Sequence, residues 1–161
     1  MAMTMKTEGM DQLNQLMAAL GNRAQEVASG ALFDGAGVMA NAITKAVSEI
    51  KTAPFKYAAG GRTRLPSPEE KAALEGKTGI AKFRNTGEEV NTIIGINARS
   101  GYADVNGKQK PVPLIARSIN SGTSFMKKQP VIRKAVTQNR AAAEQAMIAK
   151  AEKMFSEITK G

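Results

Sequence analysis

The chain of 161 residues contains no cysteine, no histidine and no tryptophan. Without cysteine there are no disulfides and no thiolates, and without histidine there is no imidazole to bind a metal or to act as a general base. Only carboxylate, lysine or tyrosine chemistry remains open. No apolar run approaches the roughly 18 residues of a membrane-spanning helix, and the first ten residues lack the apolar segment of a signal peptide. We therefore expect a soluble, intracellular protein that holds no metal and no cofactor.

The length is that of one domain, which we expect to cover residues 1–161. A chain of this size buries roughly 68–70% of the surface that it exposes when unfolded, which is enough for a hydrophobic core without cross-links.

Charge is concentrated in the second half of the chain. There are 23 basic and 14 acidic residues, a net charge of +9, and residues 81–161 alone hold 14 of the basic and 6 of the acidic ones. Between Arg99 and Arg140, nine basic residues face one acidic residue, Asp104. Such a cluster attracts a polyanion, but it is equally typical of a solvated surface. The seven aromatic residues do not alternate with the basic ones, which argues against a base-stacking platform.

Helical periodicity extends over the first fifty residues of the chain, after Gly9. Apolar residues at 13, 16, 17 and 20 predict a first helix from Met10, which we expect Gly21 and Asn22 to interrupt. A second helical stripe continues to Ile50, and we expect Pro54 to end it. Glycines at 30, 35 and 37 predict a kink or a break in this helix.

The residue pattern changes twice in the middle of the chain, first at residue 55 and again at Ile80. Residues 55–79 are rich in glycine and proline and predict a surface excursion, in which Ser67, Pro68 and Glu70 form the capping box of a short helix that Gly76 closes. From Ile80 the apolar period becomes two, which indicates strands. We expect a turn at residues 85–87 and a hairpin around Asn106-Gly107, the strongest short signal for one, and hence one antiparallel sheet.

Two helices are predicted after the strands. A short amphipathic helix follows Pro113 and stops at Gly122, and Pro130 opens a last helix that runs to about Thr159. A strand is also expected at residues 3–7. The predicted fold class is therefore α+β, with long N-terminal and C-terminal helices packed on an antiparallel β-sheet.

Two motifs suggest chemistry, and both have simpler explanations. Residues 35–40 spell the dinucleotide-type pattern GxGxxA, but the preceding residues are helical in period, so close packing of small residues is the better interpretation. The adjacent carboxylate pairs Glu69-Glu70 and Glu88-Glu89 do not point the same way on a helix or a strand. We therefore expect no catalytic residue and no enzymatic activity.

Four short segments resemble one protein family. They are Gly9-Met10-Asp11-Gln12-Leu13, Ala53-Pro54, Ile119-Asn120-Ser121-Gly122-Thr123 and Pro130-Val131-Ile132-Arg133-Lys134-Ala135. Their order resembles that of the tail-completion, or head-tail joining, proteins of long-tailed bacteriophages. Ser121 stands where an aromatic residue is common in that family, Val131 stands where Phe is usual, and residues 56–79 look like an insertion.

The resemblance implies a structural virion protein, made in the cytoplasm of the host bacterium. It implies a homo-oligomeric ring, commonly a hexamer, between the tail tube or terminator and the head connector, and no membrane partner. A ring around packaged DNA tolerates a basic lumen that touches the backbone without reading bases. We therefore name five candidate residues for the DNA channel or a subunit interface: Arg117, Lys127, Lys128, Arg133 and Lys134. The alternative is a small basic protein that binds nucleic acid without sequence specificity.

Overall fold

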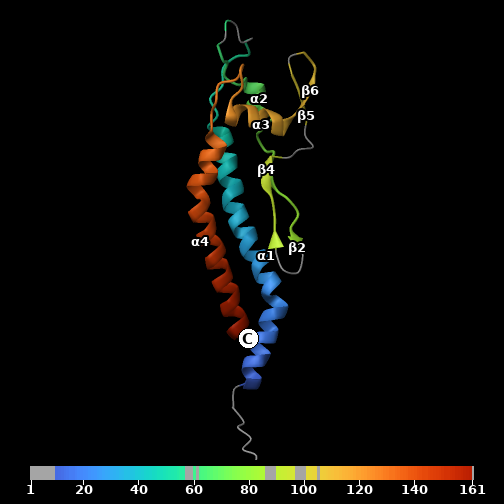
Figure 1. Ribbon diagram of the computed structural model, residues 1–161, viewed down its shortest axis with the longest axis vertical. Coiled ribbons are helices and arrows are strands. Elements are labelled where there is room, and N and C mark those ends of the chain that lie inside the picture. The colour runs from blue at the N-terminus through green and yellow to red at the C-terminus, as the bar shows by residue number, and fades with distance from the viewer. Residues whose placement is uncertain are drawn as a thin grey trace, which may run out of the picture.

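The computed structural model describes residues 10–56, 60, 62–85, 90–96, 101–104 and 106–160. Two long antiparallel helices lie side by side and form a rod, with a head of shorter elements at one end (Figure 1). The helices are α1 (Met10–Ser48), α2 (Pro68–Ala72), α3 (Val112–Ser121) and α4 (Val131–Lys160). The α+β class and the two long terminal helices are as the sequence predicts. The strand expected at residues 3–7 lies outside the described residues.

The described strands form three two-stranded antiparallel sheets, so the prediction of one sheet is wrong. They pair as β1 (Thr78–Ile80) with β4 (Ile94–Ile96), β2 (Arg84–Asn85) with β3 (Val90–Asn91), and β5 (Gly101–Ala103) with β6 (Gln109–Pro111). The described strands are two or three residues long. Strands this short cover little area, and the long helices are buried mainly by each other.

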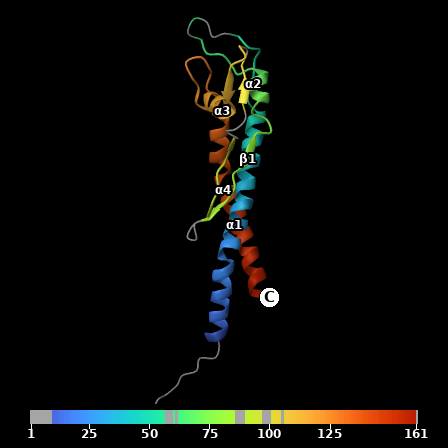
Figure 2. The same cartoon turned by 90° about the vertical axis from the view of Figure 1, so that its right-hand side faces the viewer.

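The first two sheets continue one another along a single ribbon. Ile80 pairs with Ile94 and Arg84 pairs with Asn91, so three residues on one strand oppose two on the other. This mismatch is a β-bulge, and it increases the local twist of the ribbon. Figure 2 shows the ribbon lying along α1, where Phe83 reaches Phe33 with ring centroids 6.2 Å apart. Residues 86 and 87 of the predicted turn lie outside the described residues.

The predicted hairpin around Asn106-Gly107 is confirmed. β5 and β6 pair on either side of it, and Gly107 takes the left-handed φ of 75° that the turn requires. Asp104 Oδ1 accepts hydrogen bonds from the main-chain N–H groups of Asn106 (3.0 Å) and Lys108 (2.9 Å). An aspartate that bonds the backbone a few residues ahead is a common turn-forming device.

The first helix is continuous, so the interruption expected at Gly21 and Asn22 and a break at the later glycines are both wrong. α1 runs through Gly21 and Asn22 and through the three later glycines without interruption. A single glycine costs a helix about 1 kcal/mol, and that cost does not stop a ladder whose other residues are good helix formers. The helix also ends earlier than expected, at Ser48 rather than next to Pro54. The chain leaves it to make other main-chain hydrogen bonds, such as that from Ala53 N–H to Pro66 O at 3.0 Å.

The other predicted helices are confirmed, although α3 begins at Val112 and contains Pro113 instead of following it. The capping box of α2 is complete, because the Ser67 hydroxyl accepts from Glu70 N–H and the Glu70 carboxylate accepts from Ser67 N–H at 2.8 Å. Gly76 follows with a positive φ of 69°. α3 ends at Ser121, just before Gly122, and α4 begins directly after Pro130.

The hydrophobic core lies in the head, where α3 crosses the upper part of the rod. Its buried members come from α1 and the residues just after it, the segment after α2, α3 and the loop before α4: Ile43, Val47, Ile50, Leu74, Val112, Ile115, Ala116, Ile119 and Met126. In the described part of α4, only Ala143 is buried. The lower part of the rod is therefore a two-helix structure with large exposed flanks.

Candidate interaction surfaces

The two long helices approach closely where α1 carries glycine. A Cβ built on Gly35 would come 2.5 Å from Met147 Cγ and 3.1 Å from the carbonyl oxygen of Ala143. A Cβ on Gly30 would come 2.8 Å from Met154 Sδ, whereas one on Gly37 would meet nothing within 4 Å. The interpretation of GxGxxA as close packing is thus confirmed for Gly35. Gly35 and Gly37 lie inside α1, so their N–H groups belong to the helical ladder and not to a phosphate-binding turn.

A partly buried ion pair organises the head. Arg64 donates two hydrogen bonds to Glu70, Nη1 to Oε2 at 2.7 Å and Nη2 to Oε1 at 2.6 Å, and its guanidinium lies 4.7 Å from the centre of the Phe55 ring. The side chains of Arg64 and Glu70 are 12% and 9% exposed. A bidentate pair of this kind is short and directional, and it holds the loop before α2 against the helix.

The ion pair shifts both pKa values. The hydrogen bond with Glu70 raises the pKa of Arg64 above its ordinary value. Burial alone would raise the pKa of Glu70, but the hydrogen bonds from Arg64 and Ser67 N–H, together with the charges of Arg64 and Lys110, outweigh it. The pKa of Glu70 therefore lies below its ordinary value. The Glu70 carboxylate therefore has a structural role, since Arg64 and Ser67 N–H both bind it.

Two sets of hydrogen bonds position the loop that precedes α4. Arg64 N–H donates to Phe125 O at 2.9 Å, and Lys127 N–H donates back to Arg64 O at 2.8 Å. The side-chain amide of Gln129 bonds both main-chain groups of Lys51, each at 2.9 Å. The backbone of the loop is therefore held in place although its lysine side chains are exposed.

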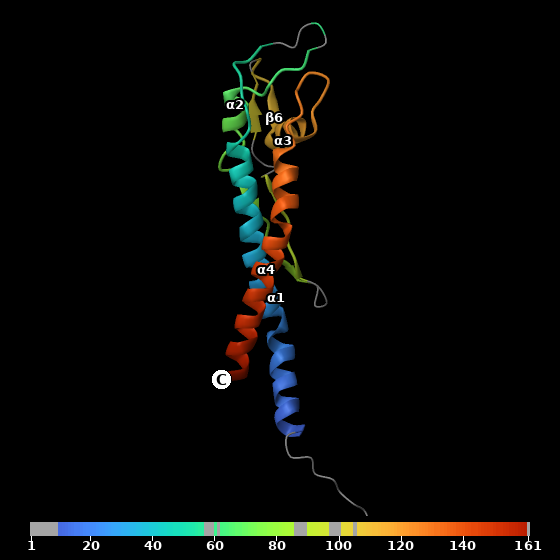
Figure 3. The same cartoon turned by 90° about the vertical axis from the view of Figure 1, so that its left-hand side faces the viewer.

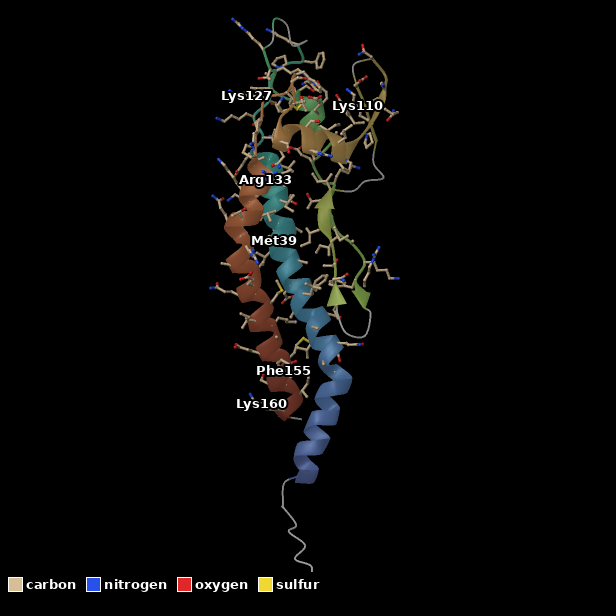
Figure 4. All side chains as sticks on the ribbon, viewed as in Figure 1. Met39, Lys110, Lys127, Arg133, Phe155 and Lys160 are labelled. Atoms are coloured by element: carbon tan, nitrogen blue, oxygen red, sulfur yellow. The ribbon has the colours of Figure 1, made fainter. Side chains whose placement is uncertain are left out.

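The five candidate basic residues are all exposed but come from three elements. Arg117 lies on α3, Lys127 and Lys128 lie on the loop before α4, and Arg133 and Lys134 lie on the first turns of α4. We call Lys127, Lys128, Arg133 and Lys134 the basic edge. Figure 4 places Lys127 and Arg133 along one side of the head and Lys110 on the opposite side. The basic run of the sequence is therefore divided between two sides of the molecule.

Other members of the basic run have acidic partners. Lys110 Nζ lies 3.0 Å from Asp104 Oδ2, and its hydrogen bond is the main reason why the pKa of Asp104 is below its ordinary value. Arg140 pairs with Glu144 at 2.9 Å one helical turn away. The Arg140–Glu144 pair is exposed and contributes little stability, but both pairs neutralise the local charge. Arg99 lies outside the described residues.

The helix pairing adds a basic residue that sequence reasoning missed. A hollow of about 250 Å³ between α1 and α4 brings Lys45 together with Lys134 of the basic edge. Glu49, Gln138 and Asn139 also line it. Lys45 belongs to the nearly neutral first half of the sequence, and no local pattern indicates that it faces α4.

A larger groove, of about 360 Å³, is mostly apolar. It lies where α1, β4, α3 and α4 meet, and five of its aliphatic residues are Ile43, Ile94, Ile96, Ile132 and Val136. Arg117, Asn120 and Ser121 also line it. Arg117 thus borders an apolar groove. It lies on α3, whereas the lysines of the basic edge lie on α4 and on the loop before it.

Large apolar side chains are also exposed on the rod. Phe33 on α1 is 57% exposed, and Ile148 and Phe155 on α4 are 58% and 38% exposed. Ile148 and Phe155 are seven residues apart and therefore lie on the same flank of α4. Single exposed apolar residues are ordinary, but two at heptad spacing on a helix flank favour a contact with another helix.

The remaining features offer little for chemistry. Among the described residues, no group of three or more acidic side chains is placed to hold a metal ion, and no helix is long and apolar enough to cross a membrane. Glu88 and Glu89 lie outside the described residues. The chain matches no protein-family model, and no curated protein or solved structure is significantly similar to it.

Proposed function

We propose that this protein is a structural subunit of a tailed-bacteriophage particle, which assembles into a homo-oligomeric ring at the junction of tail and head. Its partners are copies of itself, the tail tube or terminator, and the head connector. The proposal rests on the resemblance of four sequence segments to tail-completion proteins and on one property of the molecule, the exposed apolar flanks of its rod.

The exposed apolar flanks of the rod are the observation that carries the proposal. Phe33 of α1 is 57% exposed, and Ile148 and Phe155 of α4 are 58% and 38% exposed. Among the described residues of α4, only Ala143 is buried. A rod with a small core and exposed apolar flanks gains most from burial against other subunits, which is the situation of a ring component.

Association is tested by measuring the mass of the purified protein with light scattering and native mass spectrometry, followed by negative-stain microscopy with and without tail tubes. We expect a closed oligomer, alone or on the tube end. A strictly monomeric protein that leaves tail tubes unchanged would contradict the proposal. Particles that are complete and infectious without the protein would contradict its place in the virion.

One observation favours the second candidate, a non-specific nucleic-acid-binding protein. The basic edge is exposed, and Lys45 adds to it from α1. Such an edge contacts phosphates without reading bases, whether in the lumen of a ring or on a free monomer. Binding of duplex DNA by the monomer, with a steep salt dependence, would favour the second candidate. Binding only by the assembled ring would favour the first.

A further inference from the structure

The apolar groove beside α3 has β4 as one of its walls. Figure 1 shows β4 and α4 on opposite sides of α1, below α3, and Figure 3 shows the same end of the rod from the side of α4. Ile94, Gly95 and Ile96 all line the groove, whereas none of its lining residues comes from β1. Side chains of a strand alternate between its two faces, so three consecutive lining residues indicate that an edge of β4 faces the groove.

This edge of β4 carries main-chain groups without partners. Ala81 N–H donates to Ile93 O at 2.7 Å, so the odd-numbered residues of this strand, Ile93 and Gly95, are those that bond the opposite strand. The main-chain N–H and C=O groups of Ile94 and Ile96 therefore point away from β1. Within the described part of the chain, no hydrogen bond from another segment reaches these groups.

An unpaired sheet edge beside an apolar groove fits an extended peptide segment. The free N–H and C=O groups of an edge strand are a template on which another strand can pair. A strand added to β4 would place its alternate side chains towards the groove, which has a volume of about 360 Å³. The other walls present the aliphatic residues Ile43, Ile132 and Val136. The added strand therefore needs apolar residues at alternate positions.

The α3 wall of the groove supplies positive charge and hydrogen-bond donors. Arg117, Asn120 and Ser121 lie on one face of α3, because they are three and four residues apart. Arg117 is exposed, and no acidic side chain in the described part of the chain forms an ion pair with it. Asn120 Oδ1 accepts from Arg133 N–H at 3.1 Å, which leaves the side-chain NH₂ group to donate. These donors suit a carboxylate on the incoming strand.

We propose that this groove is the docking site of an extended segment of a partner protein, which adds to the free edge of β4 as a third strand. The segment carries apolar residues at alternate positions and an acidic residue that pairs with Arg117. Charge complementarity selects this occupant over a second copy, because two copies that met here would bring their Arg117 side chains together. The inference goes beyond the proposed ring and does not depend on it, since the site lies within one subunit.

Peptide selection followed by nuclear magnetic resonance tests the docking site. The full chain selects binders from a library of random twelve-residue peptides, and the strongest binder is added to isotope-labelled protein. We expect this peptide to have alternating apolar residues and an acidic residue. It should slow amide exchange at Ile94 and Ile96 by a larger factor than at Gly95, whose N–H already bonds β1. No enriched peptide, or a binder that leaves Ile94 and Ile96 unchanged, would overturn the inference.

Methylation of the peptide backbone separates strand addition from the burial of apolar side chains alone. In an added strand, the N–H groups of alternate residues face β4 and those of the residues between them face away. We expect N-methylation at the facing positions to weaken binding at least about tenfold, and N-methylation at the intervening positions to weaken it less than about twofold. Equal losses at the two sets of positions would contradict strand addition.

Two matched pairs of variants test the walls of the groove. Val136 is 39% exposed in the groove, and Val136→Glu should weaken peptide binding at least about tenfold, because it places a charge among aliphatic side chains. Gln138→Glu adds the same charge on α4 outside the groove and should change binding little.

The second pair tests the charge. Arg117→Gln should weaken binding about threefold or more at low salt, whereas Arg133→Gln removes an equal charge from an exposed residue outside the groove. Equal effects of Arg117→Gln and Arg133→Gln would show that the acidic residue of the peptide does not pair with Arg117, and would overturn the inference. If Val136→Glu is unfolded by circular dichroism, the arginine pair and the methylated peptides still decide.

Discussion

Met147 of α4 lies directly over Gly35 of α1, so closely that a Cβ at position 35 would come 2.5 Å from its Cγ. The clash involves an inner atom of the methionine and, at 3.1 Å, the carbonyl oxygen of Ala143, neither of which moves freely. We therefore expect Gly35→Ala to destabilise the protein by about 1–3 kcal/mol, because the two helices must separate. Gly37→Ala is the matched control in the same helix. It meets nothing within 4 Å, and we expect it to stabilise the fold by up to about 1 kcal/mol.

Urea unfolding followed by circular dichroism measures both effects from the shift in midpoint. Equal midpoints for Gly35→Ala and Gly37→Ala would mean that α1 and α4 do not pack through Gly35.

The Arg64–Glu70 pair predicts a large loss when the carboxylate is neutralised. Glu70→Gln keeps the shape of the side chain but removes the charge that Arg64 and Ser67 N–H bind. Hydrogen bonds to charged groups contribute about 1.5–3 kcal/mol each, so we expect a loss of at least about 2 kcal/mol at neutral pH. Glu75→Gln, at an exposed position in the turn after α2, is the control and should change little.

The same pair predicts an acid dependence. The pKa of Glu70 is lower in the folded protein than its ordinary value of 4.5, so the unfolded chain takes up a proton at this carboxyl first. The free energy that the carboxylate contributes is therefore fully present above pH 4.5 and is lost as pH falls from there through the folded pKa. Thermal melts between about pH 7 and pH 3 should show a smaller loss for Glu70→Gln than for the wild type. Parallel curves would show that Glu70 does not titrate with a lowered pKa.

The capping box of α2 predicts a smaller effect. Ser67 is 1% exposed, and its hydroxyl accepts from Glu70 N–H. Ser67→Ala should cost about 1 kcal/mol, the usual loss for a removed N-cap. Ser48→Ala at the end of α1 removes an exposed hydroxyl that donates to Lys45 O at 2.7 Å, and it should cost less. Denaturant midpoints of the two variants make the comparison, and a larger loss at Ser48 would contradict it.

The basic edge predicts a change in DNA binding. Lys127→Gln with Lys128→Gln removes two exposed charges from the head, and Lys153→Gln with Lys160→Gln removes two from the far end of α4. If the basic edge contacts phosphates, the first pair should lower duplex affinity and reduce the slope of log affinity against log salt by up to about 1.8, with no change from the second pair. Fluorescence anisotropy at several salt concentrations measures the slope. Equal effects of both pairs would show that binding depends on net charge alone.

Much of the fold could be predicted because its signals are local. Ser67, Pro68 and Glu70 specify the start of α2 within four residues, and Asn106-Gly107 specifies a turn within two. The break predicted at Gly21 is wrong because the local signal there is weak. A glycine signal is worth only about 1 kcal/mol, and a long run of good helix formers outweighs it. The division of the first ribbon into two sheets depends on a bulge between Ile80 and Arg84, which the alternating pattern did not reveal.

The sequence by itself determined that long helices lie at both ends of the chain, where the hairpin at Asn106-Gly107 lies, and that positive charge is in excess. Only the tertiary structure decided that Gly35 meets Met147, that Lys45 joins Lys134, and that the basic run is divided between two sides of the head. Caps, turns and periodicity act over a few neighbouring residues, so they can be read from the chain in order. The register between α1 and α4 joins residues about a hundred positions apart, and it is set by the fit of side-chain volumes into the spaces that glycines leave.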